Sequence, residues 1–301
     1  MTHAAAHALI GAYIADAATL GVHWLYDPAR IADLGEALWR EPDAADFDGA
    51  KGVFVHHGKR SGDLSQYGTQ MRVMIRALTG ASFDAQTYAQ TFAQAFGPGG
   101  WWQGYTDKAT KGTLANIAAD TTPTGANDDQ IPALSGLPAL LAVGADAETC
   151  AQAVACISHH ATTAAHAPAA AEALRLVMAG DRIEDALAGG VEAAGESARA
   201  ALAAALASDA DPVAYAGDVG RACPLPQTLP VAFRIAATAR TYREAVEINA
   251  RVGGDNCGRA IFLGALFGAG DPPPPLWAAR LNDGPALAAE IEALVRARTT
   301  G

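Results

Sequence analysis

The segment from residue 251 to 259, RVGGDNCGR, combines glycines with groups that could take part in catalysis or binding. Gly253 and Gly254 permit a tight turn or a close ligand approach, because glycine readily takes positive φ. Asp255 then precedes an apolar run, where a helix N-terminus favours a carboxylate. Alternatively, Asp255 only caps this helix and Cys257 fills the core. Four polar groups exceed what a cap requires, which predicts a functional site. They are Asp255, Asn256, Cys257 and Arg259.

Carboxylates occur at two further places. Asp16 lies in the mostly apolar segment IADAATLG, where it must find partners or stay protonated, unless it occupies an exposed face. Asp128 and Asp129 follow Asn127 and precede Pro132. Adjacent carboxylates raise each other's pKa, which suits acid and base roles. Asn-Asp-Asp before a helix is equally typical of turns and caps.

Aromatic, amide and imidazole side chains occur in three other polar segments. HWLYD contains Trp24, and DLSQYGTQM brings Tyr67 and Gln70 to a helix start, where backbone amides and hydroxyls can hold an anion or a ribose. His160 and His166, in SHHATTAAHA, are not four residues apart, so they do not indicate a histidine metal pair. A packed loop and capped helix starts are the alternatives for these segments.

The composition limits the class of protein. Of 301 residues, 50% are hydrophobic and 18% charged, and the net charge is −11, which argues against nucleic acid and anionic membranes as partners. We expect a small-molecule partner, and the sequence does not indicate an oligomeric state. The first twenty residues lack the basic start of a signal peptide, and no uncharged apolar run reaches membrane-spanning length. Four cysteines without a CxxC pair predict reduced thiols and a cytoplasmic location.

The elements that position these groups are predicted to be helices. Apolar spacing and caps indicate a helix capped by Ser82, a second starting near Asp283, and several between them. GVFVHH, residues 52–57, is the best strand candidate, and no βαβ alternation occurs. We predict one compact all-α domain, residues 1–301. The helices between are expected at 146–157, 167–179 ending at Gly180, 183–207 with breaks at Gly189, Gly190 and Gly195, and 242–250.

The order of these segments resembles that of the ADP-ribosylglycohydrolase family. GAYIADAATLG resembles its opening G-x-x-x-G-D-A-x-G helix, with Asp16 at the acidic position, and GDLSQYGTQM resembles its T-D-D-T-Q-M segment. GANDDQIPAL stands where the family has a Ser-Asn-Gly segment that touches ADP-ribose. SHHATTAAHA resembles its Thr-His segment, and GGDNCGRAIFLGALFGA its closing G-G-D-T-D-T helix. The resemblance covers almost the whole chain and implies an all-α bundle of this family's type.

The family's two magnesium ions lack most of their ligands in this sequence. The resemblance puts the early metal-binding positions at residues 66–68, Gln-Tyr-Gly, and the late ones at Asp255, Cys257 and Gly258. Hard divalent cations need several oxygen ligands, preferably anionic, and only Asp255 remains. We therefore expect neither metal nor other cofactor. HWLYD, YGTQ and GGDNCGRA resemble the metal-depleted branch that includes the J-crystallins.

These segments are consistent with four functions. The first is a metal-independent hydrolase of an N-glycoside or ADP-ribose-like small molecule, with carboxylates as acid and base. The second uses Cys257 as nucleophile with His159 or His160 as base, although a buried inert thiol is simpler. The third is a non-catalytic, crystallin-like protein, and the fourth a magnesium-dependent hydrolase, which the lost ligands disfavour. The predicted catalytic residues are Asp16, Asp128, Asp129, Asp255 and Cys257, and the predicted substrate-binding residues are Trp24, Tyr67, Gln70, Asn127, His160, Asn256 and Arg259.

Overall fold

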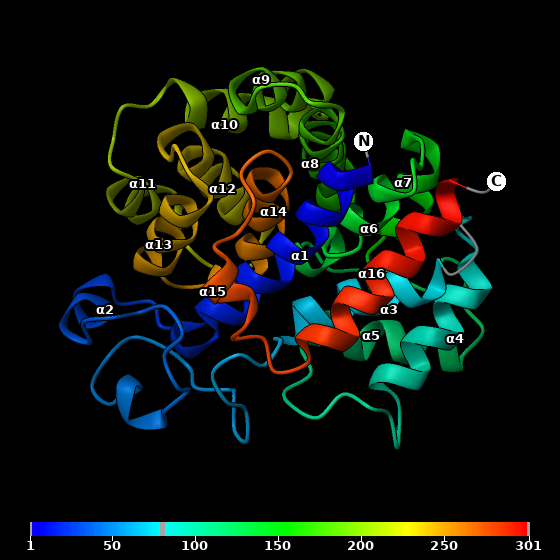
Figure 1. Cartoon of the computed structure of the whole chain (residues 1–301), viewed down its shortest axis with the longest axis horizontal. Coiled ribbons are helices and arrows are strands. Elements are labelled where there is room, and N and C mark those ends of the chain that lie inside the picture. The colour runs from blue at the N-terminus through cyan, green and yellow to red at the C-terminus, as the bar shows by residue number, and fades with distance from the viewer. Residues whose placement is uncertain (1, 79–81, 300–301) are drawn as a thin grey trace.

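A computed structural model describes residues 2–78 and 82–299. Its helices are arranged around a central antiparallel pair, α1 and α14 (Figure 1). α1 (Thr2–Thr19) and α14 (Asn256–Gly268) are the two helices that contact each other most extensively. Every residue of α14 is buried, and so is nearly all of the second half of α1. Both helices are apolar on most of their circumference, as expected for helices enclosed on all sides.

The contact between α1 and α14 depends on glycine. A Cβ at Gly11 would lie 2.4 Å from the carbonyl oxygen of Gly264, and a Cβ at Gly264 would lie 2.5 Å from that of Gly11. One turn further, a Cβ at Gly268 would lie 2.7 Å from the carbonyl oxygen of His7. The two backbones therefore approach more closely than side chains permit. This packing puts the N-terminus of α14 beside the C-terminal turns of α1.

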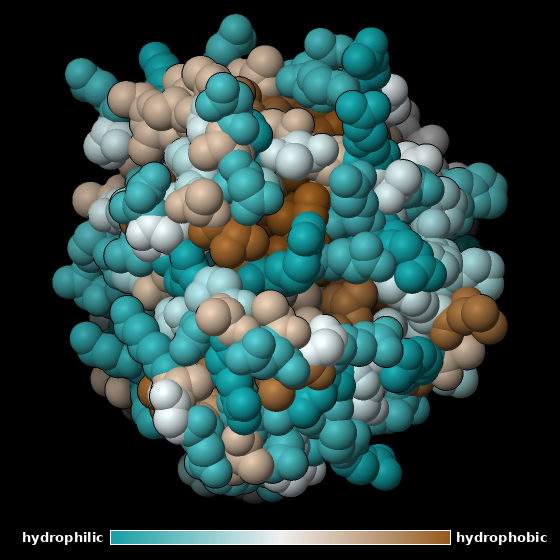
Figure 2. Space-filling view, turned by 90° about the vertical axis from the view of Figure 1, so that its left-hand side faces the viewer, coloured by the Kyte–Doolittle hydropathy of each residue, from teal (hydrophilic) through white to brown (hydrophobic). Residues whose placement is uncertain are grey.

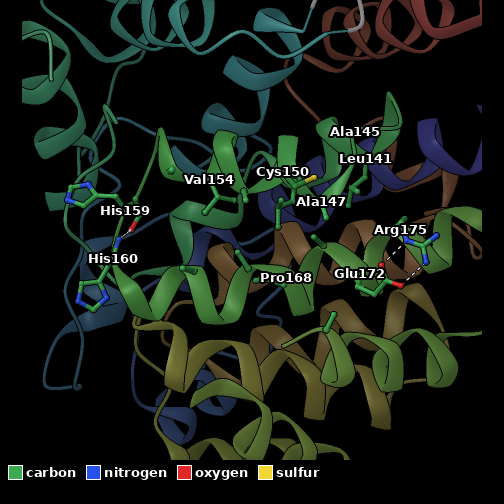
Figure 3. Close-up of a pocket in the computed structure, with 18 residues that line it drawn as sticks. Leu141, Ala145, Ala147, Cys150, Val154, His159, His160, Pro168, Glu172 and Arg175 are labelled. Carbon is green, nitrogen blue, oxygen red and sulfur yellow. Dashed lines mark hydrogen bonds and ion pairs between the residues drawn. The ribbon is translucent and has the colours of Figure 1, made fainter. Parts of the chain in front are cut away.

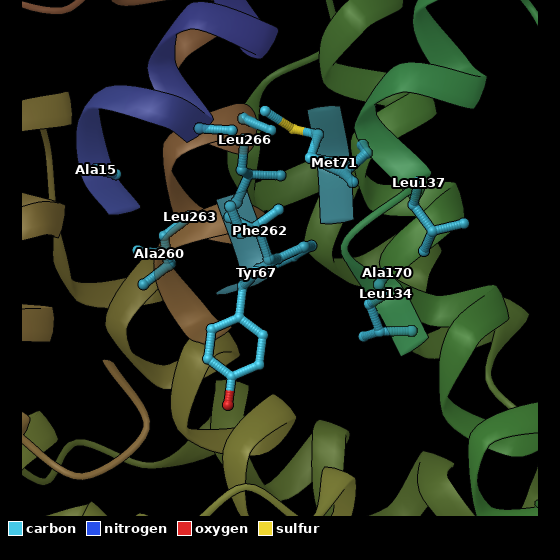
Figure 4. Packing of buried hydrophobic residues seen from close by; sticks show 14 of the residues in the cluster. Ala15, Tyr67, Met71, Leu134, Leu137, Ala170, Ala260, Phe262, Leu263 and Leu266 are labelled. Carbon is cyan, nitrogen blue, oxygen red and sulfur yellow. The ribbon is translucent and has the colours of Figure 1, made fainter. Parts of the chain in front are cut away.

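The remaining helices surround this pair, and the buried apolar side chains form one continuous cluster (Figure 4). The described residues contain no strand, only three isolated bridges, so the all-α prediction is confirmed. The other helices are α2 (Pro28–Asp33), α3 (Gln66–Ala77), α4 (Ala85–Phe96), α5 (Lys108–Ala118), α6 (Leu137–Ala142), α7 (Ala147–Ala155), α8 (Ala161–Ala179), α9 (Ile183–Ala193), α10 (Glu196–Ala207), α11 (Pro212–Val219), α12 (Leu225–Thr238), α13 (Tyr242–Val252), α15 (Pro275–Ala278), α16 (Gly284–Thr299), and the short 3-10 helices η1 (Leu20–Val22), η2 (Ala44–Phe47) and η3 (Ile131–Leu134).

Several predicted helix boundaries differ from the observed ones. Asp84, not Ser82, caps α4, because its carboxylate accepts from the Thr87 amide at 2.7 Å. α8 begins six residues before the predicted start at 167, since His160 caps it, and it ends at Gly180 (φ 104°) as predicted. The stretch 183–207 forms two helices, α9 and α10, which separate before Gly195.

One further expectation needs correction. Residues 52–57 form no strand, and only Gly52 makes a bridge, with Leu25. The segment His3–Val22 is long and apolar enough to cross a membrane by length and composition alone, although Asp16 interrupts it. Because 83% of its most apolar stretch is buried, it serves here as a core helix.

The face of the molecule shown in Figure 2 is mostly hydrophilic, with hydrophobic areas separated by polar side chains.

Replacement of Gly264 by alanine tests the glycine contact. We expect Gly264→Ala to lower the free energy of unfolding by about 1–3 kcal/mol, because the added methyl group meets backbone that cannot easily yield. Gly270→Ala is the control, since nothing lies within 4 Å of its Cβ position and its φ is not positive. Equal denaturant midpoints for the two variants would contradict the role assigned to this contact.

Candidate active site

Asp255 is the centre of a buried polar network at the start of α14. Its Oδ1 accepts from Nε2 of His23 at 3.0 Å and from the Gly258 amide at 3.2 Å, and its Oδ2 accepts from the Tyr67 hydroxyl at 3.2 Å. Positive φ at Gly254 (65°) and at the preceding glycine brings the chain into this turn. Burial alone raises the pKa of Asp255, but the hydrogen bond and charge of His23 hold it below its ordinary value. Asp255 therefore carries a stabilised negative charge.

Two histidines extend this network. The Nδ1 atom of His23 lies 2.7 Å from Nε2 of His56, so the three side chains form a continuous chain of hydrogen bonds from Asp255. Both rings are buried. Burial, with the neighbouring charge of His23, lowers the pKa of His56 well below its ordinary value, so His56 is neutral at pH 7.

Asp16 forms the second part of the network. It is fully buried, and its carboxylate accepts from the Ser65 amide at 2.8 Å and from the Ser65 hydroxyl. Burial raises the pKa of Asp16 from 3.8 to about 7, although the bonds from Ser65 oppose the shift. Ser65 also accepts from the Tyr67 amide, which joins Asp16 to the Asp255 network. The Tyr67 ring packs in the apolar core while its hydroxyl points away from it (Figure 4).

A small cavity of about 10 Å³ adjoins this network. His56, Tyr67 and Asp107 are among the residues that line it. An aromatic wall, consisting of Trp24, Trp102 and Tyr105, lines it as well. Trp24 takes an unusual positive φ of 65° and meets Tyr105 edge to face, with ring centroids 5.2 Å apart. The predicted site residues Trp24 and Tyr67 are thus brought to one cavity.

Asp107 presents a buried carboxyl group to this cavity. It caps α5, with Oδ1 accepting from the Thr110 amide at 2.7 Å, whereas Oδ2 has no hydrogen-bond partner among the described residues. Burial raises the pKa of Asp107 despite the bond from Thr110. Gln66 and Gln70 both donate to the Thr110 hydroxyl, at 3.0 and 2.9 Å, which fixes α5 against α3. The Oε1 atom of Gln70 is buried without a partner.

Four predicted residues lie in a neighbouring group that does not line this cavity. Burial, with the adjacent charge of Asp129 contributing, raises the pKa of Asp128, and the charge of Asp128 in turn raises that of Asp107. Asn127 is exposed and Asp129 half-buried. His160 caps α8, accepting from the Thr162 amide through Nδ1 at 3.1 Å. A direct role of these side chains in the cavity would need a ligand that extends toward them.

Two residues of α14 predicted to bind substrate, Asn256 and Arg259, are enclosed by protein. Asn256 donates to the Thr19 carbonyl at 3.1 Å. Arg259 donates through Nε to the side chain of Asn249 at 2.9 Å and through Nη2 to the Gly253 carbonyl, and burial lowers its pKa to about 10. These two residues have no exposed surface, so they fasten α14 to α1 and α13.

The thiol of Cys257 does not suit a nucleophile. It has no exposed surface, and its Sγ lies 3.7 Å from both the Thr19 hydroxyl and the Asp16 carbonyl oxygen. Burial raises the pKa of this thiol well above its ordinary value, and the charges of Asp16 and Asp255 raise it further. An activated cysteine has the opposite shift.

Three groups at the cavity were absent from the predicted site. His23 stands in the polar segment HWLYD and His56 in the strand candidate GVFVHH, but nothing local shows that they pair across 33 residues. Asp107 stands in a glycine-rich stretch without a motif, so the sequence offers no signal beyond its ability to cap a helix.

A larger cavity of about 460 Å³ lies between α7 and α8 (Figure 3). Its walls are mostly alanine and other apolar side chains, including Cys150 and Val154. His159 and His160 lie at one end of it and Arg175 at the other (Figure 3). Apart from Glu172, which pairs with Arg175, no carboxylate of the described residues lines it, whereas the buried carboxyl group of Asp107 lines the smaller cavity.

Comparisons with known proteins identify the family and the fold of the chain. The model of the ADP-ribosylglycohydrolase family matches residues 2–300. The chain belongs to this family. A solved structure, titled "ADP-ribosylglycohydrolase-related protein complex", covers 99% of this chain and 98% of its own, with a TM-score of 0.77 and 18% sequence identity. At that identity the likeness shows the ADP-ribosylglycohydrolase fold alone. A search of the curated proteins finds no match.

The family's metal-binding positions do not fit magnesium in this chain. Both carboxylate oxygens of Asp255 are already bonded, to the imidazole of His23 and to the hydroxyl of Tyr67. A Cβ at Gly68 would lie 2.3 Å from Oδ2 of Asp16, so even the smallest ligand side chain has no room there. Among residues 2–78 and 82–299, no three His, Cys, Asp or Glu side chains are grouped to hold a metal ion.

The raised pKa of Asp16 predicts a pH-dependent stability. The folded state binds a proton at about pH 7, whereas the ordinary pKa is 3.8, so the free energy of unfolding should fall as pH rises from about 4 to 7. The full difference corresponds to about 4 kcal/mol. Asp16→Asn, which cannot titrate, should lack this fall in chemical denaturation series. Asp209→Asn, at an exposed position, should retain it. Parallel curves for wild type and Asp16→Asn would contradict the assignment.

Proposed function

We propose that this chain hydrolyses the glycosidic bond of an N-glycoside or ADP-ribose-like small molecule without the family's dinuclear magnesium site. Membership of the ADP-ribosylglycohydrolase family supports a glycohydrolase-type activity. The metal-independent mechanism is our proposal, and it assigns the chain to a metal-depleted branch like that of the J-crystallins. A cytoplasmic location and a small-molecule substrate are parts of the same proposal.

One observation carries this proposal. Asp255, the one ligand retained at the family's metal-binding positions, is bonded to the His23 imidazole and the Tyr67 hydroxyl. Those groups adjoin a cavity that also holds a carboxyl group and three aromatic rings. Glycoside hydrolysis needs one group to protonate the leaving atom and another to activate water. Aromatic faces suit a planar or sugar-like ligand. The cavity thus offers the required chemistry from side chains alone.

A non-catalytic, crystallin-like protein is the second candidate. The observation that favours it is the size of the cavity, since about 10 Å³ holds only about one water molecule. Binding of a substrate therefore requires the aromatic wall to move. If the wall never opens, the same groups stabilise the fold and carry out no reaction.

Hydrolysis of ADP-ribosylarginine and nicotinamide riboside, followed by chromatography of the released base, distinguishes the two candidates. We expect turnover of at least one compound, unchanged by EDTA and by added Mg²⁺, together with a raised melting temperature in ADP-ribose. Loss of turnover in EDTA would reject the metal-independent mechanism. No turnover and no thermal shift with any compound would favour the structural candidate.

Replacement of Asp255 by asparagine tests whether the carboxylate does more than cap α14. Asparagine caps a helix almost as well as aspartate, but it cannot supply the negative charge next to His23. We expect Asp255→Asn to lower kcat by at least about 10²-fold while the protein stays folded. Asp146→Asn, at the cap of α7, is the matched control and should leave kcat unchanged. Full activity of Asp255→Asn would limit Asp255 to its structural role.

A further inference from the structure

The buried chain of hydrogen bonds that starts at Asp255 ends at the cavity that Asp107 also lines. We propose that His56 is the general base and Asp107 the general acid of the hydrolysis, with His23 and Asp255 as positioning residues. This inference rests on the proposed function and names the groups that perform it. None of the family motifs recognised in the sequence contains His56 or Asp107.

The order of donors along this series of hydrogen bonds determines which nitrogen of His56 is basic. A carboxylate only accepts, so Nε2 of His23 carries the proton that is donated to Asp255. When the His23 imidazole is neutral, its Nδ1 carries no proton and accepts a hydrogen bond from the Nε2–H group of His56. In this state the free lone pair of His56 is on Nδ1. Asp255 orients this series of hydrogen bonds in the way that a buried carboxylate fixes the tautomer of a catalytic histidine.

Asp107 is suited to the opposite role. Its Oδ1 is held by the Thr110 amide, so the position of the carboxyl group is fixed by the start of α5. Its Oδ2 is buried without a hydrogen-bond partner among the described residues, which is costly for a charged oxygen and favours a proton there. Asp107 is 3% exposed, and the buried Asp128 carboxyl nearby further disfavours ionisation. A protonated carboxyl group at the cavity can donate to a leaving atom.

The two groups complete a balanced hydrolysis. A water molecule attacks the anomeric carbon while Nδ1 of His56 takes one of its protons, so a C–O bond forms. The glycosidic C–N bond breaks, and the proton of Asp107 passes to the departing nitrogen. His56 is then protonated and Asp107 ionised, and solvent returns the proton from one to the other after the products leave. The cavity of about 10 Å³ has the size of one such water molecule.

Paired variants test the assignment with ADP-ribosylarginine, because its departing guanidine nitrogen needs a proton, whereas the pyridinium nitrogen of nicotinamide riboside leaves without one. His56→Gln keeps a donor toward His23 but removes the basic lone pair, and Asp107→Asn keeps the cap of α5 but removes the acidic proton. We expect each to lower kcat by about 10²–10⁴-fold with KM changed much less. His57→Gln and Asp84→Asn are the controls, because His57 is a neighbouring histidine outside the cavity and Asp84 is an exposed helix cap. Both should keep wild-type kcat.

A second measurement does not depend on turnover. The ¹⁵N chemical shifts of histidine should show His56 and His23 in the wild type each protonated on Nε2 and not on Nδ1. Protonation of His56 on Nδ1, or full activity of either His56→Gln or Asp107→Asn, overturns the assignment. If neither ADP-ribosylarginine nor nicotinamide riboside is hydrolysed by the wild type while these tautomers are found, the proposed function is rejected, and the catalytic roles with it, whereas the hydrogen-bond chain stands.

Discussion

The close approach of α1 and α14 is the constraint on which the rest of the structure depends. Gly11 and Gly264 allow the two backbones to touch, and this contact fixes the start of α14 against the last turns of α1. Asp255 and Asp16 consequently enter the interior from different helices, at neighbouring places. The fully buried hydrogen bonds of Asn256 and Arg259 act in the same direction, because each satisfies a backbone carbonyl near that junction. A shift of either helix would disturb every group of the network.

The two buried carboxylates are stabilised in opposite ways. Asp16 receives hydrogen bonds from Ser65, which do not offset the cost of burial, so its pKa rises to about 7. Asp255 receives an imidazole, a phenol and a backbone amide, and its pKa falls. Both carboxyl groups are fully buried, so the difference comes from their hydrogen-bond donors and from the neighbouring charges of His23 and Arg259 at Asp255. Identical residue types thus supply one group that titrates near neutral pH and one that stays charged there.

The sequence was sufficient for the helical class and for part of the site. Helical apolar spacing is a local property, and Asp16, Tyr67 and Asp255 stood out as polar exceptions beside glycines or within apolar runs. The pairing of His23 with His56, and the position of Asp107, depend on how separate loops fold together, which no local pattern encodes. The same limit applies to Asn256 and Arg259. Their polarity suggested contact with a ligand. In the structure, Asn256 donates to the carbonyl of Thr19, which is distant in sequence, and Arg259 donates to the carbonyl of Gly253, in the turn before α14.

The aromatic wall of the small cavity has a kinetic consequence. Lys59 lies over the ring of Trp102 at 4.0 Å, and Trp24 and Tyr105 meet edge to face, so opening the cavity requires several favourable contacts to break together. If the cavity admits a substrate, as proposed above, these side-chain movements set an upper limit on the rate of capture. The same movements must precede release, so they limit entry and exit alike.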